Sequence, residues 1–328
     1  MKLNLFFRKS EIGFYSIETV FKTIEPFFDK RYDLNNLSLP NSDLSYKAIK
    51  SNLKYSSRNR ADINHITGHI NYIALATGKN TVLTIHDMIS ALQGHPLKRF
   101  FMLCFWFWIP ALFVKRITVI SEHTKREVFR YIPFAKSKVV VINNPIGNNF
   151  EYFPKEFNRL KPNILCVGTK SNKNLDRIFK ALASIDCKLT IIGKLENGTK
   201  RLLEEYQINY LSLVDLSEEE VIKAYKDCDL LCFASLYEGF GMPIIEAQAI
   251  GRPVITSNFG AMKEISKGTT CLVDPLEVNS IQNGIEKIIS DESYRQELVS
   301  KGIKNAKRFK AEFIAEKYIK VYEDILNG

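Results

Sequence analysis

The most informative stretch of this chain runs from Glu238 to Glu246 and reads E-G-F-G-M-P-I-I-E. An apolar run at 230–234 precedes it and predicts a buried strand, and apolar residues at helical spacing follow it. Glycines let backbone amides approach a ligand closely, and a helix N-terminus presents unpaired N–H groups with partial positive charge. Pro243 suits the start of the helix, where its missing N–H costs nothing. A strand, a glycine turn and a helix start in this order predict an anion-binding site.

The two glutamates of this stretch are placed to face one ligand. Glu238 lies in the predicted loop, and Glu246 lies about one turn into the predicted helix. A diphosphate with hydroxyl-rich groups on either side fits this arrangement, because a carboxylate accepts hydrogen bonds from hydroxyls. The alternative interpretation is an ordinary strand–turn–helix unit with two glutamates on its surface.

Strand and helix patterns alternate along the whole chain, which predicts parallel sheets covered by helices. Strands are expected at 2–7, 61–67, 81–86, 117–121 and 138–142, and again at 163–167, 188–192, 210–214, 229–234, 253–256 and 270–273. Helices are expected at 16–28, 44–55, 70–77, 96–114 and 122–131, and again at 174–185, 196–206, 217–227, 243–250, 278–289 and 293–309.

A polar stretch punctuated by prolines, 144–162, divides this pattern in two. We therefore expect one Rossmann-like domain at 1–150, a second at 158–310, and a helix at 311–328 that crosses back to the first. Two such domains would leave a cleft at the carboxyl ends of their strands, where open α/β sheets bind ligands.

The composition is that of a soluble globular enzyme. With 328 residues, of which 45% are hydrophobic and 25% charged, the chain fits two domains and is neither disordered nor fibrous. Six cysteines are scattered without the spacing of a zinc or redox site, which indicates free thiols in a reducing cytosol. The short apolar start is followed by Arg8 and Lys9 without a cleavage site, so we expect no signal peptide and a cytoplasmic location.

Positive charge is concentrated in the N-terminal half. Residues 1–158 contain 22 Lys and Arg against 12 Asp and Glu, whereas residues 159–328 contain 24 of each. An aromatic segment at 100–114, F-F-M-L-C-F-W-F-W-I-P-A-L-F-V, has two basic residues on either side. As a helix it is shorter than the roughly 20 residues that span a bilayer. Both features indicate peripheral contact with the anionic inner face of the cell membrane. A solubilising surface and a core helix are the alternatives.

Several short motifs around the glutamate pair carry a family resemblance. They are V-G-T at 167–169, K-N-L at 173–175, S-L-Y-E-G-F-G at 235–241, G-R-P-V-I at 251–255, T-I-H-D at 84–87 and V-I-S-E-H-T at 119–124. With these motifs the chain resembles, over nearly its whole length, the retaining glycosyltransferases of family 4 (glycosyl transferases group 1). The resemblance implies the GT-B fold, an α/β architecture of two Rossmann-like domains facing across a cleft, and a nucleotide-sugar donor.

The resemblance also implies a role for each part of the glutamate stretch. Glu246 would bind the ribose hydroxyls of the nucleotide sugar. Glu238 would orient the donor sugar or stabilise positive charge that develops at its anomeric carbon. The backbone amides between the two glutamates would hold sugar hydroxyls and phosphate, and they belong to Gly239, Phe240, Gly241 and Met242.

Further donor contacts are implied outside this stretch. Lys173 would neutralise the leaving diphosphate, the electrostatic stabilisation expected for a charged leaving group. His86, at the carboxyl end of a strand, would reach the cleft from the N-terminal domain, and Gly13 would let the backbone pass close to the diphosphate. The catalytic candidates are thus Glu238, His86 and Lys173, and the remaining donor contacts are Gly168, Thr169 and Lys170.

Three departures from the family pattern bear on this site. Many relatives carry an arginine where this chain has Thr169 or Asn172, so the phosphate pocket has one cation fewer unless Lys170 folds in. The loop after the first strand has one glycine, Gly13, instead of a pair. The acceptor side matches no subfamily closely enough to name a substrate.

Two sequence features could indicate a metal site, but their context argues against it. The D-C-D sequence at 227–229 spells a motif that binds Mn²⁺ in another glycosyltransferase fold, but here it joins a predicted helix to a buried strand. His65, His69 and His86 could hold a metal ion, but a glycine spoils the helical spacing of the first two. We therefore expect no metal and no other cofactor. The basic half lacks the spacing of nucleic-acid-binding motifs, so no nucleic-acid partner is expected.

Together these expectations describe one function. The chain would transfer a hexose from a nucleoside diphosphate sugar, with retention of configuration, to a glycan acceptor. A lipid-linked acceptor in the synthesis of O-antigen, capsule or another surface polysaccharide is expected. In the front-face mechanism proposed for retaining relatives the leaving diphosphate takes the acceptor proton, so no protein base is needed. A nucleotide-sugar epimerase of the same fold and a non-catalytic membrane-associated subunit are the alternatives.

Overall fold

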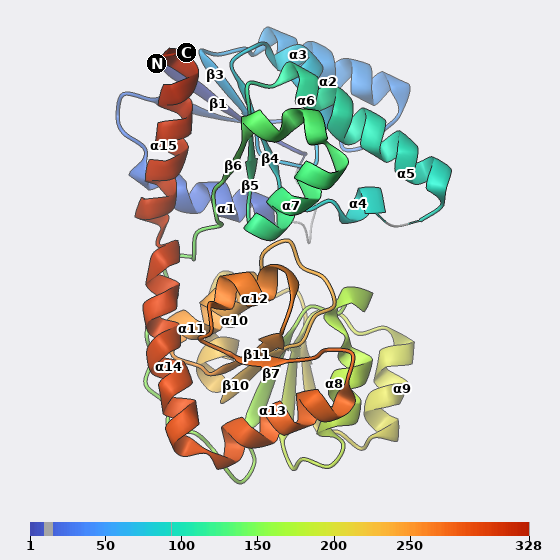
Figure 1. Cartoon of the computed structure of the whole chain (residues 1–328), viewed down its shortest axis with the longest axis vertical. Helices are drawn as coiled ribbons and strands as arrows, with labels where there is room; N and C mark the ends of the chain where they lie inside the picture. Colours follow the sequence, from blue (N-terminus) through green and yellow to red (C-terminus); the bar gives the residue numbers. More distant parts are fainter. Residues whose placement is uncertain (10–15, 93, 328) are drawn as a thin grey trace. The chain divides into compact units, whose positions relative to one another are not determined.

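The computed structural model describes residues 1–9, 16–92 and 94–327 (Figure 1). Gly13, expected to lie near the diphosphate, falls outside the described residues. The chain divides into two compact units, each built on its own sheet. Unit 1 consists of Met1–Pro145 and Ala311–Gly328, and unit 2 consists of Ile146–Lys310.

Unit 1 is built on a six-stranded parallel sheet with the order β2-β1-β3-β4-β5-β6. Its strands are β1 (Lys2–Phe7), β2 (Asp33–Ser38), β3 (Ile63–Ile66), β4 (Thr81–Ile85), β5 (Arg116–Val119) and β6 (Val139–Val141). Because the strands are parallel, their carboxyl ends all lie at the same edge of the sheet.

The strand that the sequence analysis did not predict is β2, which reads D-L-N-N-L-S. It lies at the edge of the sheet and pairs with β1. Asp and Asn are depleted in strands, and this strand is largely exposed or half-buried, so it lacks the apolar run that marks a central strand.

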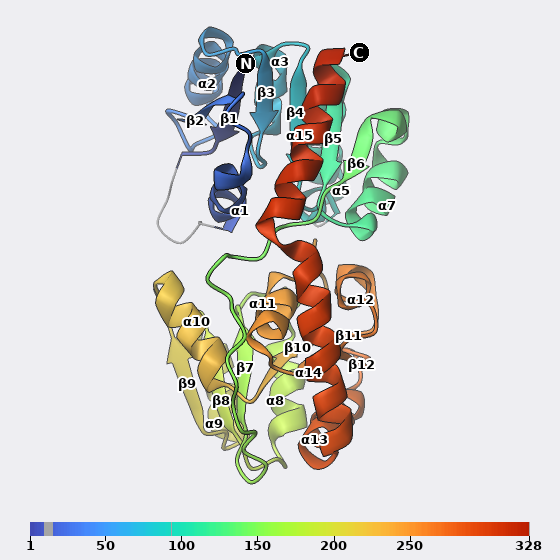
Figure 2. The same ribbon diagram turned by 90° about the vertical axis from the view of Figure 1, so that its left-hand side faces the viewer.

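Helices cover both faces of this sheet (Figures 1 and 2). One face packs against α1 (Ser16–Ile24) and the C-terminal helix α15 (Ala311–Asn327). The other face and the adjoining edge carry α2 (Tyr46–Arg58), α3 (Ala74–Thr77), α4 (Ile89–Leu92), α5 (Pro96–Met102), a π-helical turn (Leu103–Trp108), α6 (Ile109–Phe113) and α7 (Glu122–Tyr131). Both faces are therefore buried, as a parallel sheet requires.

His65 lies inside unit 1, where both of its ring nitrogens are occupied. Nδ1 lies 2.7 Å from the hydroxyl of Tyr322 on α15, and Nε2 lies 2.7 Å from Oγ1 of Thr84 on β4. Burial lowers the pKa of His65 to about 3, so the ring stays neutral. His65 therefore belongs to the packing that ties α15 to the sheet, and its nitrogens are not available to a metal ion.

Unit 2 repeats the architecture, with the strand order β12-β11-β10-β7-β8-β9 and all strands parallel. The strands are β7 (Asn163–Val167), β8 (Lys188–Ile192), β9 (Tyr210–Leu213), β10 (Leu230–Phe233), β11 (Val254–Ser257) and β12 (Cys271–Val273). The chain builds outward from β7 in one direction and from β10 in the other. Ligands of open α/β sheets bind at the carboxyl ends of the strands where the order reverses in this way, which here means beyond β7 and β10.

The helices of unit 2 pack on both faces of its sheet. One face carries α8 (Leu175–Leu182), α9 (Asn197–Glu205) and α13 (Val278–Ser290). The other carries α10 (Glu218–Asp227), α11 (Met242–Ile250) and α12 (Gly260–Ser266), and α14 (Glu292–Ala306) packs on α11. The short α12 was not predicted, because its seven residues begin with a glycine and give too little periodicity to detect.

Candidate functional site

The loops after β7 and β10 are tied to each other at the switch point of unit 2. The backbone N–H of Leu236 donates to the carbonyl of Asn172 at 2.7 Å. Asn174, in the left-handed conformation with φ 59°, donates from its side-chain amide to the carbonyl of Ala234 at 3.0 Å. Asparagine tolerates this conformation better than other side chains do. The two loops that carry Lys173 and Glu238 are thereby fixed against one another.

Gly168 makes room for Lys173. It has φ 89°, which favours glycine, and a Cβ at this position would lie 2.6 Å from Cε of Lys173. The lysine side chain therefore lies directly across the end of β7, where only a glycine permits it. This is the structural role of the glycine in the V-G-T motif.

Lys173 and Glu238 form an ion pair between the loops that follow β7 and β10. Nζ of Lys173 lies 2.7 Å from Oε1 of Glu238, and the side chains are only 17% and 16% exposed. The Asn172 amide donates to the same oxygen at 3.2 Å and to the carbonyl of Tyr237 at 2.8 Å. The Lys173 ammonium also lies 4.5 Å from the centroid of the Phe233 ring. A cation held in this way is positioned for an anionic ligand.

Glu246 projects from α11, whose start is set by Gly241. This glycine caps the helix at φ 110°, and Pro243 follows in the first turn. Glu246 accepts a hydrogen bond of 2.5 Å from the hydroxyl of Tyr225 on α10. Burial raises the pKa of the Glu246 carboxyl to about 7, while the Tyr225 hydrogen bond and the Lys173 ammonium oppose that rise. A glycine turn, a helix N-terminus and a partly buried carboxylate thus adjoin, as expected.

The other predicted donor contacts contribute in different ways. The Phe240 side chain is buried and packs edge-on against Phe309 at 5.6 Å, so it is the backbone of Phe240 that remains for a ligand. Thr169 donates from its hydroxyl to the Lys194 carbonyl at 2.8 Å, and Lys170 is exposed. Gly239 and Met242 complete the loop and the first helical turn.

His86 belongs to unit 1, immediately after β4. Its Nε2 lies 2.7 Å from the carbonyl of Thr67, and its ring stacks on His69 with centroids 6.2 Å apart. Burial lowers the pKa of His86 to about 4, and the neighbouring His69 and Arg8 contribute to the lowering. Because a carbonyl only accepts, Nε2 carries the proton of a neutral ring and Nδ1 is left as an acceptor. His86 is therefore suited to accept a hydrogen bond from a ligand.

The carboxylates of the D-C-D sequence have other partners. Asp229 is 3% exposed; it accepts from the backbone N–H groups of Asn163 at 2.7 Å and Asn158 at 3.1 Å, and it pairs with Lys155. Asp227 lies on α10 and pairs with Lys223. Within residues 1–9, 16–92 and 94–327, no three His, Cys, Asp or Glu side chains are grouped to hold a metal ion.

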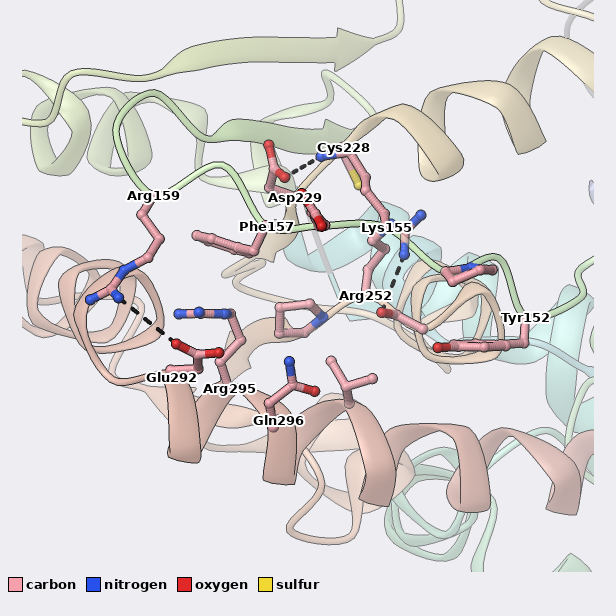
Figure 3. A pocket seen from close by; sticks show the side chains of 15 residues that line it. Tyr152, Lys155, Phe157, Arg159, Cys228, Asp229, Arg252, Glu292, Arg295 and Gln296 are labelled. Atoms are coloured by element: carbon pink, nitrogen blue, oxygen red, sulfur yellow. Dashed lines mark hydrogen bonds and ion pairs between the residues drawn. The ribbon is translucent and has the colours of Figure 1, made fainter.

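A cavity of about 620 Å³ lies at the opposite edge of the unit 2 sheet (Figure 3). Asp229 and Arg252, which line it, precede β10 and β11 and so mark the amino ends of the strands. Two ion pairs lie in its lining: Lys155 with Asp229, and Arg159 with Glu292 at 3.8 Å. The switch point lies at the other end of the strands, so this cavity is not the candidate site.

Residues that line this cavity hold the first segment of unit 2 in place. Arg252 is buried and donates to the carbonyls of Phe153 at 3.0 Å and Tyr225 at 3.1 Å. Together with Asp229, which accepts from the backbone N–H groups of Asn158 and Asn163, it holds the segment 153–163 against the rest of unit 2. The sequence predicts a first domain that ends at 150 and a second that begins at 158, because the prolines and polar residues around this boundary resemble a free linker.

Two contributors to the site were missed from the sequence. In the sequence Asn172 marks only the absence of an arginine, yet its amide donates to Glu238 and to the carbonyl of Tyr237. In the sequence Tyr225 is only one position of a helical pattern, yet its hydroxyl donates to Glu246. No local motif marks either residue, because both contacts join segments more than 20 positions apart.

Two family models match this chain. The model described as "Glycosyl transferases group 1" matches residues 148–307, and the model "Glycosyltransferase Family 4" matches residues 21–148. The first therefore covers nearly all of unit 2, including both glutamates, and the second covers most of unit 1.

Among curated proteins the chain is similar to two mannosyltransferases of Escherichia coli. It is 26% identical over 261 residues to the serotype-specific mannosyltransferase WbdA, which covers 70% of this chain and 31% of the relative. It is 32% identical over 238 residues to O-antigen chain mannosyltransferase B, which covers 64% of this chain and 60% of the relative. The matches thus span less than two thirds of the length of these relatives.

Among solved structures the chain is similar to Anabaena Alr3699/HepE in complex with UDP and glucose. The TM-score is 0.79 at 14% identity, over 99% of this chain and all of the other. At this identity the likeness establishes the fold alone. It confirms the predicted architecture of two Rossmann-like domains, the GT-B fold.

Proposed function

The chain belongs to the group 1 glycosyltransferases of family 4, and from this premise we propose that it transfers a hexose from a nucleoside diphosphate sugar to a glycan acceptor. The observation that carries the proposal is the Lys173–Glu238 ion pair at the switch point of unit 2, next to a helix N-terminus and Glu246. Cationic and N–H groups suit a diphosphate, and the two carboxylates suit the hydroxyls on either side of it.

In the proposed reaction the residues of unit 2 hold the donor and stabilise its leaving group. Glu246 accepts hydrogen bonds from the ribose hydroxyls. When the donor binds, the Lys173 ammonium leaves Glu238 and pairs with the diphosphate. There it neutralises the negative charge that grows on the diphosphate as the bond breaks. This exchange frees the Glu238 carboxylate to orient the donor sugar. The amides of the loop and of the first turn of α11 face the diphosphate and the sugar.

The chemical step is proposed to proceed with retention. The bond between the anomeric carbon and the diphosphate oxygen breaks, and the acceptor hydroxyl oxygen bonds to that carbon on the same face. The hydroxyl proton passes to the departing diphosphate, so the products are a nucleoside diphosphate and a glycoside. A neutral His86, with its pKa lowered to about 4 and Nε2 donating to a carbonyl, is in keeping with a scheme that needs no protein base.

The proposed donor sugar and acceptor are those that the names of the two relatives suggest. A mannosyl donor is the first to test, because both relatives are called mannosyltransferases. A growing polysaccharide chain of the O-antigen or capsule type, carried on a lipid at the inner face of the cell membrane, is the proposed acceptor.

Metal independence is part of the proposal. Lys173 and the N-terminus of α11 supply positive charge where a diphosphate would lie, which is the role that Mg²⁺ or Mn²⁺ plays in other sites. Transfer is therefore expected to be unchanged by EDTA. Loss of transfer on chelation, restored by one divalent ion, would contradict this part.

Contact with a membrane is proposed through one apolar helix of unit 1. The stretch Pro96–Phe113, 18 residues long, comprises α5, the π-helical turn and α6, and only 17% of it is buried. It is the one helix in the described part of the chain that could cross a membrane by length and composition, and it begins before the aromatic segment 100–114. The exposed apolar residues are Leu97, Phe100, Phe101, Phe105, Leu112 and Phe113.

The opposite side of this helix is anchored in unit 1. Phe107 is 2% exposed, and the Trp108 indole N–H donates to the carbonyl of Tyr131 at 2.7 Å. A helix held in this way can lie in the membrane interface with its phenylalanines inserted and its basic flanks at the headgroups. This geometry favours an interfacial position over a span.

Replacing the stacked pair Phe101 and Phe105 with serine is expected to weaken vesicle binding at least tenfold. Each aromatic ring inserted into lipid contributes about 1.5–3 kcal/mol by burial. The measurement is co-sedimentation with vesicles that contain 30% anionic lipid in roughly 0.1 M salt. Tyr46→Ser, at an exposed aromatic residue of α2, is the matched control. Equal binding by the double variant and the wild type would contradict the proposed surface.

Product analysis tests the proposed function against the epimerase alternative. The protein is incubated with nucleotide sugars, with and without a membrane extract as acceptor, and the products are identified by mass spectrometry. Transfer predicts a nucleoside diphosphate and a glycosylated acceptor formed together. An altered sugar or nucleotide sugar formed without acceptor would instead indicate an epimerase.

A further inference from the structure

Tyr225 is the nearest partner of Glu246, and the contact is short and directional. The hydroxyl lies 2.5 Å from Oε2 of Glu246. Tyr225 comes from the last turn of α10, whereas Glu246 comes from the second turn of α11. Within the described chain no other hydrogen bond to Glu246 is found, so Oε1 is left to a ligand. The carboxylate is thus held at one oxygen and open at the other.

The packing around Tyr225 holds its side chain, and therefore its hydroxyl, in one position. The side chain is fully buried, and its ring packs edge-on against Phe150 with centroids 5.7 Å apart. Its carbonyl accepts from Nε of Arg252 at 3.1 Å and from Sγ of Cys228 at 3.3 Å. Neither the ring nor the backbone of Tyr225 can move without disturbing this packing.

We infer that Tyr225 is a positioning residue for donor binding, which turns the free oxygen of Glu246 toward the ribose hydroxyls. This inference rests on the proposed function, since it assigns the ligand of Glu246 to a ribonucleotide. Tyr225 does not touch the donor. It holds the carboxylate in one orientation, so that less rotamer freedom is lost when the ribose binds.

The same hydrogen bond favours the ionised form of Glu246. Burial and the Glu218 carboxylate raise the pKa of Glu246, whereas Tyr225 and Lys173 lower it, with a result of about 7. The pKa of Tyr225 lies well above its ordinary value because of its burial and the adjacent Glu246 charge, so the phenol remains the donor. Removing the hydroxyl takes away a group that favours the carboxylate form, so the pKa of Glu246 rises further.

Tyr225→Phe is the direct test, with UDP and GDP and their 2′-deoxy counterparts as calorimetric probes. We expect the variant to bind the ribonucleotide about threefold to tenfold more weakly, because the freed Glu246 side chain must then be ordered when the ribose binds. The preference for the ribonucleotide over its 2′-deoxy form should shrink. The pH below which affinity is lost should move upward from that of the wild type, because the carboxyl is protonated at higher pH. Tyr210→Phe, at a half-buried tyrosine of β9, is the matched control.

These readouts separate positioning from a merely structural role. Loss of packing alone would weaken both probes equally and leave the pH midpoint in place, and that result would overturn the inference. If Tyr225→Phe unfolds, Phe150→Leu loosens the ring but keeps the hydroxyl. That variant should also lose ribose discrimination, and unchanged discrimination would overturn the inference. If Glu246→Ala binds the probes as the wild type does, the proposed function itself fails, whatever Tyr225→Phe does.

Discussion

Glu246→Ala is expected to reduce affinity for the donor nucleotide at least a hundredfold. In the proposed complex this carboxylate accepts two hydrogen bonds from the ribose, and each bond to a charged group is worth about 1.5–3 kcal/mol. The variant also leaves the buried Tyr225 hydroxyl without its partner, so a modest loss of stability is expected. Calorimetric titration with the nucleoside diphosphate measures the first effect, and thermal unfolding measures the second.

Glu246→Gln distinguishes charge from shape at this position. The amide keeps the size of the side chain and can still accept a hydrogen bond, but it does not titrate. It should bind the nucleotide more weakly than the wild type at pH 8 and lose less affinity than the wild type between pH 8 and 6, a range in which the terminal phosphate of the nucleotide also begins to take up a proton. The wild type should lose affinity over that range, because a carboxyl with a pKa of about 7 becomes protonated as the pH falls through 7. A wild-type affinity independent of pH would contradict this role.

Lys173→Ala is expected to lower the rate of transfer about 10²–10³-fold, the usual effect of removing one group that stabilises a developing charge. The effect should fall mainly on kcat, because the charge on the leaving diphosphate grows toward the transition state. Steady-state kinetics with donor and acceptor give kcat and KM separately. Lys173→Arg keeps the charge and should retain part of the activity.

A double-mutant cycle with Glu238 tests whether Lys173 acts on the diphosphate or only on its ion-pair partner. If Lys173 merely neutralised Glu238, removing both side chains would restore much of the lost activity. The proposed function expects the Lys173→Ala, Glu238→Ala double variant to be at least as slow as the slower single variant. Restoration in the double variant would reduce Lys173 to a structural role.

The strand, turn and helix that carry the two glutamates can be predicted from the sequence, because these parts are adjacent in the chain. The strand, the glycine turn and the helix of residues 230–250 give both the topology and the position of the glutamates, and the structure agrees with each of them. Lys173 is expected at the site only through the family resemblance, and the structure brings it beside Glu238 because β7 and β10 are neighbours in the sheet. Local patterns were thus sufficient for β10 and α11, which flank the glutamate stretch.

The parts that the sequence did not predict depend on contacts between distant segments. Tyr225 and Asn172 act through partners on other elements, and nothing in their immediate neighbours marks that role. The edge strand β2 is not recognisable from an apolar run, because its residues are exposed or half-buried and need not be apolar. The segment 146–162 resembles a linker in the sequence, because the buried Arg252 that donates to its Phe153 carbonyl lies about a hundred residues further along the chain.

The donor site is tested most simply by calorimetric titration of the purified protein with UDP-, GDP-, dTDP- and ADP-sugars, with and without EDTA. We predict micromolar binding of one nucleotide class, unchanged by EDTA and lost in Glu246→Ala. Binding of none of these nucleotides, or binding that Glu246→Ala leaves intact, would contradict the assignment of a donor site to unit 2 and favour a non-catalytic protein with this fold.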